Sequence, residues 1–190
     1  AAWQLAHAGW NVELFEMRPE MKTPAHQTEH CAELVCSNSL GSTLPDRAGG
    51  VLQAELKTLN CHLLSVAEAH SVPAGNALAV DRGNFAADVT QQLEAHPRIQ
   101  LRRQEAKAIP DGPCIVATGP LTSPDLAKNI QQLAGQDQLA FFDAIAPVVT
   151  ADSLNREIIF SASRWQEGEG DYFNVPLNRQ QYETFVEDLL

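Results

Sequence analysis

A cysteine set among small polar residues is the side chain in this sequence best suited to nucleophilic chemistry. Cys36 lies in the run ELVCSNSL at residues 33–40. Hydrogen-bonding neighbours of this kind can tune the reactivity of a thiol. Enzymes that add carbon to C5 of a pyrimidine need a nucleophile at C6, and a thiolate is suited to that addition. The alternative is a structural cysteine buried in a turn, and the composition of the segment alone favours that alternative.

An acidic residue at the end of a predicted strand could bind the ribose of a dinucleotide cofactor. Polar and apolar residues alternate over 11–16, which is the period of a strand, and Glu16 stands at its end. The glycine fingerprint of such folds is absent, so Glu16 alone is better interpreted as a solvated strand-end residue. The turn Ala117-Thr118-Gly119 follows an apolar run, and its glycine would let the backbone approach a ligand closely. Together the two features favour a dinucleotide cofactor.

The cysteine and histidine pattern does not predict a metal site. The four cysteines show no CxxC pair, and no second ligand pair follows the cluster of His26, His30, Cys31 and Cys36. No signal peptide or membrane-spanning run is visible, which predicts a cytoplasmic protein with free thiols.

The charge balance argues against a nucleic-acid footprint that extends over the whole sequence. The chain of 190 residues has 13 basic and 24 acidic residues, a net charge of −11. A local basic cluster of Arg98, Arg102, Arg103 and Lys107 is interpreted as the solvent face of a strand.

Alternating helices and strands must position these residues, and they predict an α/β fold with a largely parallel sheet. The helices are expected at residues 1–8, 47–69, 84–96, 124–134 and 178–190, and the strands at 11–16, 99–102, 114–117 and 139–142. In the helix at 84–96, Asn84 is the expected N-cap, and Phe85, Val89 and Leu93 should face inward. The helix at 1–8 has no visible start, so we expect a first strand and a glycine-rich turn to precede it. The helix at 178–190 has no C-cap, so both ends of the chain are expected to be incomplete.

Several segments, in order along the chain, carry a resemblance to a known family. They are EMRP at 16–19, KTPAH at 22–26, AELVCSNSL at 32–40, VPAG at 72–75, ALAVDR at 77–82 and ATGPLTSP at 117–124. These segments closely resemble the methylenetetrahydrofolate–tRNA (uracil-5-)-methyltransferases, the TrmFO family, which is related to the MnmG/GidA flavoproteins. The resemblance extends over nearly the whole chain.

The resemblance implies an activity and its cofactors. FAD would be bound in a Rossmann-like domain and reduced by NAD(P)H, and methylenetetrahydrofolate would donate the carbon. The product would be a uridine of the tRNA T-loop methylated at C5. By the family's motifs, Cys36 would attack C6 of the uracil or otherwise take part close to the flavin. The cofactor contacts would come from Glu16 at the ribose, Arg18 on the adenosine side, Ala106 at the adenine, Thr118 and Gly119 along the cofactor, and Asn38 near the isoalloxazine ring.

The resemblance also implies a domain division and leaves alternatives open. Residues 1–143 would form a partial FAD-binding domain, and residues 144–190 would begin an inserted substrate- or tRNA-binding domain. The family's second functional cysteine would lie beyond the present C-terminus, and Gly41 replaces a residue that is commonly charged. The alternatives are a non-catalytic fragment, a related FAD-dependent tRNA-uridine-modifying protein, or an NAD-binding oxidoreductase unrelated to RNA.

Overall fold

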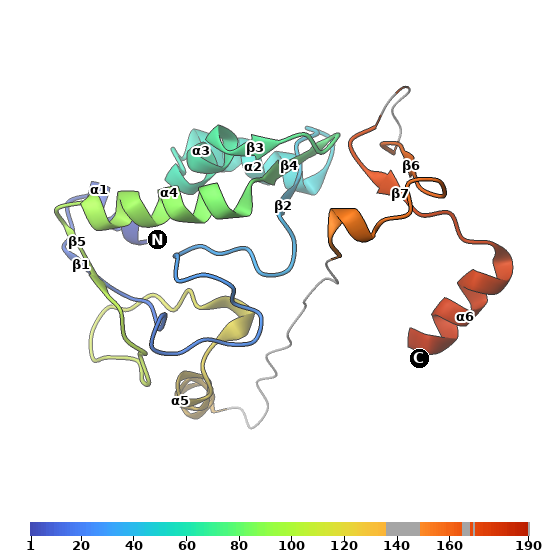
Figure 1. The fold of residues 1–190 in the computed structure, drawn as a ribbon. Helices are drawn as coiled ribbons and strands as arrows, with labels where there is room; N and C mark the ends of the chain where they lie inside the picture. The colour runs from blue at the N-terminus through green and yellow to red at the C-terminus, as the bar shows by residue number, and fades with distance from the viewer. Residues whose placement is uncertain (136–148, 165–167, 169, 190) are drawn as a thin grey trace.

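The computed structural model describes residues 1–135, 149–164, 168 and 170–189 (Figure 1). In chain order the elements are α1 (Ala2–His7), β1 (Val12–Phe15), β2 (Ser39–Ser42), α2 (Ala48–Thr58), α3 (His62–Ala69), β3 (Ser71–Val72), β4 (Ala77–Val80), α4 (Arg82–Ala95), β5 (Ile99–Arg102), η1 (Gly119–Leu121), α5 (Pro124–Ala134), η2 (Ala151–Ser153), β6 (Phe160–Ser161), β7 (Phe173–Asn174) and α6 (Arg179–Leu189). The predicted α/β class is confirmed. None of the helices in these ranges is long and apolar enough to cross a membrane.

The strand that carries Glu16 pairs with a strand far along the chain. β1 and β5 run parallel, with Val12 opposite Ile99 and Phe15 opposite Arg102. Each strand follows a helix, α1 before β1 and α4 before β5, and both helices contact β5. Gly9 takes a φ of +97° between α1 and β1, as expected for the residue that stops a helix. The strand pair that ends near Glu16 is therefore held in place by two helices packed against β5.

A second, antiparallel sheet follows the Cys36 segment. Its strands lie in the order β2-β4-β3, so β4 is central and pairs with the strand that begins at Ser39. Figure 1 shows α4 running from beside β4 toward the β1–β5 pair. The prediction of a largely parallel sheet thus holds for β1 and β5, whereas the other described sheets are antiparallel.

The core lies where α4 meets β4, α3 and β5. Val80 and Phe85 are fully buried, and Val89 and Leu93 are buried one and two turns beyond Phe85. The predicted inward face of this helix is confirmed. Its N-cap is Asp81 rather than Asn84, because the Asp81 carboxylate accepts a hydrogen bond from the Asn84 backbone N–H at 3.0 Å.

The predicted single helix over 47–69 is wrong. Asn60 takes a φ of +53° and separates α2 from α3, since a left-handed residue ends the helical hydrogen-bond series. Leu52 and Leu59 are 55% and 69% exposed, and Leu56 packs partly buried against the core. The buried side chains of the second helix include Leu64 and Val66. The change of direction at Asn60 places a different face against the core.

The predicted buried strand at 114–117 is wrong as well. These residues have no regular structure, and Ile115 and Val116 are 59% and 43% exposed. A short apolar run becomes a strand only where a neighbouring strand offers backbone groups for pairing, and β1 is paired only with β5 among the described residues. The predicted strand at 139–142 and the division between residues 143 and 144 lie outside the described residues.

Residues 149–189 contribute the hairpin of β6 and β7 and the helix α6. The hairpin contacts the loop before β4, because the Asp171 carboxylate accepts from the Gly75 N–H and the Tyr172 hydroxyl donates to the Ala74 carbonyl at 2.6 Å. A capping box begins α6: Asn178 and Gln181 each accept from the other's backbone N–H at 2.9 Å. Figure 1 shows α6 extending away from the helices around α4.

The contrast between two phenylalanines gives a test of this core. Replacing Phe85, which is 1% exposed, by Ala should lower the free energy of unfolding by about 3–5 kcal/mol because it leaves a cavity. Phe185→Ala, at a side chain that is 53% exposed, is the matched control and should change it by less than about 0.5 kcal/mol. Urea unfolding followed by circular dichroism measures both. Equal losses in the two variants would contradict this placement of the core.

Candidate functional site

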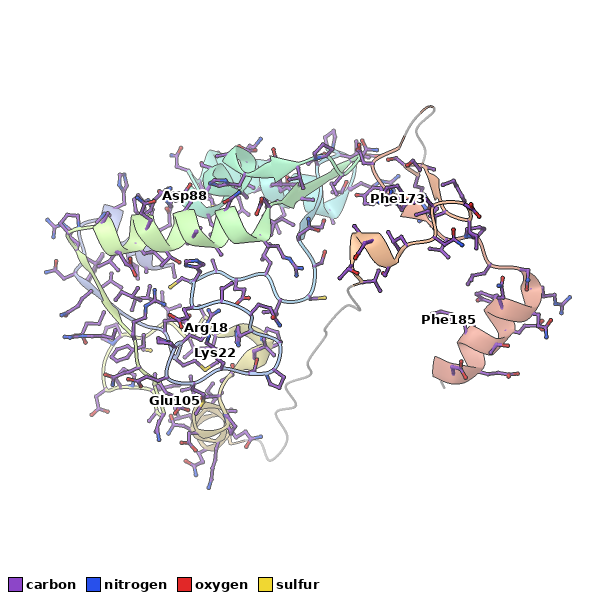
Figure 2. All side chains as sticks on the ribbon, in the orientation of Figure 1. Arg18, Lys22, Asp88, Glu105, Phe173 and Phe185 are labelled. Atoms are coloured by element: carbon purple, nitrogen blue, oxygen red, sulfur yellow. The ribbon has the colours of Figure 1, made fainter. Side chains whose placement is uncertain are left out.

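An arginine buried between two glutamates organises the carboxyl end of β1. The Arg18 side chain is 5% exposed, and those of Glu16 and Glu33 are 18% and 8% exposed. Arg18 Nε donates to Glu16 Oε1 at 2.8 Å and Arg18 Nη2 donates to Glu16 Oε2 at 3.0 Å, a bidentate pair. Arg18 Nη1 donates to Glu33 Oε2. Figure 2 shows Arg18 within the loop that follows β1.

Glu33 also fixes the backbone of its own loop. Its Oε1 accepts from the Gln27 N–H at 2.8 Å and from the Thr28 N–H at 3.1 Å. Arg18 Nη1 reaches the Thr28 carbonyl at 3.5 Å, so the ion pair and the loop backbone form one network. Sequence reasoning assigned Glu33 no role. The one available sequence signal for such a role is that Glu33 stands between the apolar residues Ala32 and Leu34. A carboxylate buried in such surroundings needs a cationic or hydrogen-bonding partner.

The electrostatics of this network favour charged carboxylate and guanidinium groups. Burial opposes ionisation of Glu16, but the hydrogen bonds and positive charge of Arg18, with the charge of Arg103, hold the pKa of Glu16 below its ordinary value. For Arg18, burial alone would lower the pKa, but hydrogen bonding to Glu16 and the charges of both carboxylates raise the pKa above its ordinary value. Glu16 is therefore a carboxylate at neutral pH.

The Cys36 thiol is exposed, as its candidate role requires. The segment before it is anchored by α4: the Cys31 N–H donates to Thr90 Oγ1 at 2.8 Å, and Arg82 Nη1 donates to the Leu34 carbonyl at 3.2 Å. After Cys36, Asn38 Nδ2 donates to the Val80 carbonyl at 3.1 Å. The thiol thus lies on a loop held on both sides by side-chain hydrogen bonds to the core elements.

The other predicted cofactor residues lie on loops. Ala106 is half-buried and follows β5 rather than lying on a strand, because β5 ends at Arg102. Beside it, the Oε1 atom of Glu105 is buried and has no hydrogen-bond partner in the described structure. Thr118 and Gly119 are exposed, and Gly119 takes a φ of +66° at the start of η1, with open space around its α-carbon. The expected glycine turn is therefore present without the expected strand before it.

The structure brings only some of the predicted residues together. Glu16 and Arg18 are in direct contact, whereas Asn38 bonds to the Val80 carbonyl and Thr118 to Thr122. A shallow hollow lies at the opposite, amino-terminal end of the strand pair, lined by Asn11, Val12, Glu13, Pro97, Arg98, Ile99 and Gln100. It does not include Glu16, so we assign it no role in the site.

Each member of the basic cluster has a local partner. Arg98 donates to the Gly9 carbonyl, Arg102 pairs with Glu13 at 3.1 Å, and Arg103 pairs with Glu94 at 3.0 Å. Lys107 lies within 4 Å of both Glu105 and Asp125. The interpretation as a solvated, paired surface fits these contacts. Within the described ranges, no group of three histidine, cysteine or acidic side chains could hold a metal ion.

The lowered pKa of Glu16 predicts how stability depends on pH. Glu16→Gln should cost about 1.5–3 kcal/mol at pH 7, because a hydrogen-bonded charge is lost beside buried Arg18. The unfolded chain protonates Glu16 near its ordinary pKa of 4.5, before the folded chain does, so acid favours unfolding. The difference between wild type and variant should therefore shrink as pH falls below about 4.5 and through the lowered folded-state pKa.

Urea unfolding of both proteins between about pH 7 and pH 3 measures this difference. Glu13→Gln is the control, because Glu13 of β1 pairs with Arg102 of β5 but is 55% exposed. A difference for Glu16→Gln that stays constant throughout this range would contradict the prediction.

Comparison with known proteins places these features in a family. A family profile described as Glucose inhibited division protein A matches residues 1–190. A methylenetetrahydrofolate–tRNA-(uracil-5-)-methyltransferase TrmFO from Trichormus variabilis is 53% identical over 189 residues, covering 100% of this chain and 43% of that protein. Proteins of the same name are 52% identical in Synechocystis sp. and 50% identical in Desulfitobacterium hafniense, where all of this chain matches 42% and 44% of the relative.

The chain thus spans less than half the length of these curated relatives. The profile match nevertheless extends over every residue, and the α/β fold with its parallel strand pair agrees with it. The chain belongs to the glucose inhibited division protein A family.

Proposed function

We propose that this chain is the FAD-binding and thiol-bearing part of an enzyme that methylates C5 of a T-loop uridine in tRNA. The observation that carries the proposal is identity of 50–53% along the whole chain to proteins named methylenetetrahydrofolate–tRNA-(uracil-5-)-methyltransferase. The exposed Cys36 thiol and the charged Glu16 carboxylate at a strand end supply chemistry that such a reaction needs. Under the proposal the partner is tRNA and the compartment is the cytoplasm.

The residues present fit FAD in their chemistry. The Glu16 carboxylate accepts three hydrogen bonds from Arg18, two at Oε1 and one at Oε2, which leaves Oε2 one acceptor site. Its side chain is 18% exposed, so Oε2 can accept from a ribose hydroxyl. The unpartnered Glu105 Oε1 lies next to Ala106, and an N–H donor such as the exocyclic amine of adenine would satisfy it. Thr118 and Gly119 leave space for close approach of a ligand to the backbone. We assign Asn38, two residues after Cys36, to the isoalloxazine end, as the family's motif implies.

Cys36 supplies covalent chemistry in the proposed mechanism. Its thiolate adds to C6 of the uracil, which raises the electron density at C5. C5 can then bond to the methylene carbon that methylenetetrahydrofolate donates, and the bonds of that carbon to the folate nitrogens break, so that tetrahydrofolate leaves. After the C5 proton has left, the sulfur–carbon bond breaks and the thiolate is regenerated. Bound FAD, reduced by NAD(P)H, would supply the electrons that convert the methylene carbon to a methyl group. Exposure of Cys36 is essential, since the target base must reach the sulfur.

A visible absorption spectrum is the first test of the cofactor assignment. The purified chain, mixed with FAD and desalted, should retain a flavin spectrum in proportion to the protein. Boiling should release FAD, which chromatography identifies. A protein that stays colourless after incubation with FAD would contradict the assignment of a cofactor site to these residues.

Two exposed cysteines give a matched test of the nucleophile. In the protein as encoded by its gene, Cys36→Ala should reduce tRNA methylation by at least about a hundredfold, because no other group replaces the covalent step. Cys114→Ala, which removes the other exposed thiol, should retain nearly full activity. Mass spectrometry of digested tRNA measures 5-methyluridine and would reveal a different uridine modification. Full methylation by Cys36→Ala would exclude the nucleophile assignment.

A further inference from the structure

The Glu16–Arg18–Glu33 network fixes the orientation of the Glu16 carboxylate, which a simple surface ion pair would not do. Arg18 is bidentate to Glu16, so both carboxylate oxygens are fixed in one plane. A free carboxylate could rotate about its last bond, whereas this one is held by the planar guanidinium fork. The Arg18 backbone N–H also donates to Oε1 at 3.1 Å, so the acceptor site left on Oε2 is presented in a fixed orientation at the carboxyl end of β1.

Glu33 holds the other side of the guanidinium. Arg18 Nη1 points to Glu33, and the Glu33 side chain is 8% exposed, so the contact is shielded from water. The same carboxylate accepts from the backbone of Gln27 and Thr28, which leaves Glu33 little freedom to move. The orientation of Arg18, and through it that of Glu16, is therefore set by a residue beyond the strand.

Glu33 also belongs to the segment that carries the thiol. It precedes Cys36 within the run at 33–40, and the intervening Leu34 carbonyl accepts from Arg82 at 3.2 Å. A displacement of Glu33 would move both the Arg18 side chain and the backbone that leads to Cys36, because the chain between Glu33 and Cys36 is short and anchored.

We propose that Glu33 is a positioning residue: through Arg18 it orients the Glu16 carboxylate toward the ribose of FAD, and through the loop backbone it sets the segment that leads to Cys36. The inference rests on the proposed FAD site. It assigns Arg18 to holding Glu16, because four of its hydrogen bonds go to Glu16, Glu33 and the Thr28 carbonyl. Buried ion networks add little net stability on average, so orientation of a ligand group is the stronger reason for this one.

The test compares FAD affinity in variants of the same loop. Glu33→Gln removes the charge and keeps the shape. Glu29→Gln is the matched control, because Glu29 pairs with Lys22 in the same loop but is 59% exposed. Glu16→Gln and the double variant Glu16→Gln/Glu33→Gln complete a cycle. Quenching of flavin fluorescence gives Kd for each protein, and circular dichroism checks folding.

We expect Glu33→Gln to raise the Kd for FAD by about tenfold, a loss typical of a displaced charged hydrogen bond, and Glu29→Gln to change it by less than about twofold. Because Glu33 acts through Glu16, the double variant should bind no more weakly than Glu16→Gln alone. Should Glu33→Gln fail to fold, Arg18→Lys keeps the charge without the fork, and it should raise Kd in the same non-additive way with Glu16→Gln.

The outcomes separate the inference from the proposed function. Wild-type affinity in folded Glu33→Gln, or losses that multiply in the double variant, would overturn the positioning role while leaving the FAD site intact. Failure of the wild-type protein to bind FAD would overturn the proposed function, and the positioning role with it.

Discussion

The guanidinium of Arg18 is the constraint on which the geometry of the candidate site depends. It is almost fully buried, and a buried cation is tolerated only where carboxylates surround it. Glu16 comes from the end of β1 and Glu33 from the loop that follows, so the charge requirement brings together two segments with no shared regular structure. The loop between them must return to the strand end, because only there can Glu33 reach Arg18. A strand terminus is thus joined to the thiol-bearing segment by charge rather than by apolar packing.

The segment from residue 17 to residue 38 lacks helix and strand, yet polar contacts fix its path. Thr90 shows how: its hydroxyl accepts from the Cys31 N–H and donates to the Ala86 carbonyl within α4, at 2.8 and 2.7 Å. Arg82 holds the Leu34 carbonyl, and Asn38 bonds to β4. Functional side chains are often carried on loops that a rigid scaffold positions, and here the scaffold is the packed unit of α4 and β4. Residues of α4 therefore both form the core and hold the loop backbone that carries the Cys36 thiol.

Periodic patterns in the sequence predicted the parts of the fold that local physics determines. The apolar positions Phe85, Val89 and Leu93 predicted the buried face of α4. Patterns failed where the outcome depends on distant partners. The helix break at Asn60 depends on how α3 packs, and the apolar run at 114–117 finds no strand to pair with in the described structure. At the site, the family resemblance indicated roles for Glu16 and Cys36 that their residue types alone did not. That Glu33 reaches back to Arg18 depends on the path of the loop, which no local pattern predicts.

The same network distinguishes two thiols that lie close together in sequence. Cys31 is buried, and its burial, with the negative charge of Glu16, raises the pKa of its thiol above the ordinary value, while Arg103 and Arg18 only partly oppose this. A protonated, enclosed sulfur is a poor nucleophile. Cys36 lies beyond the anchored Leu34 carbonyl, on the exposed part of the loop, where a base can reach it. A carboxylate suited to a ribose thus also helps to keep the nearby buried thiol unreactive, which leaves covalent chemistry to the exposed one.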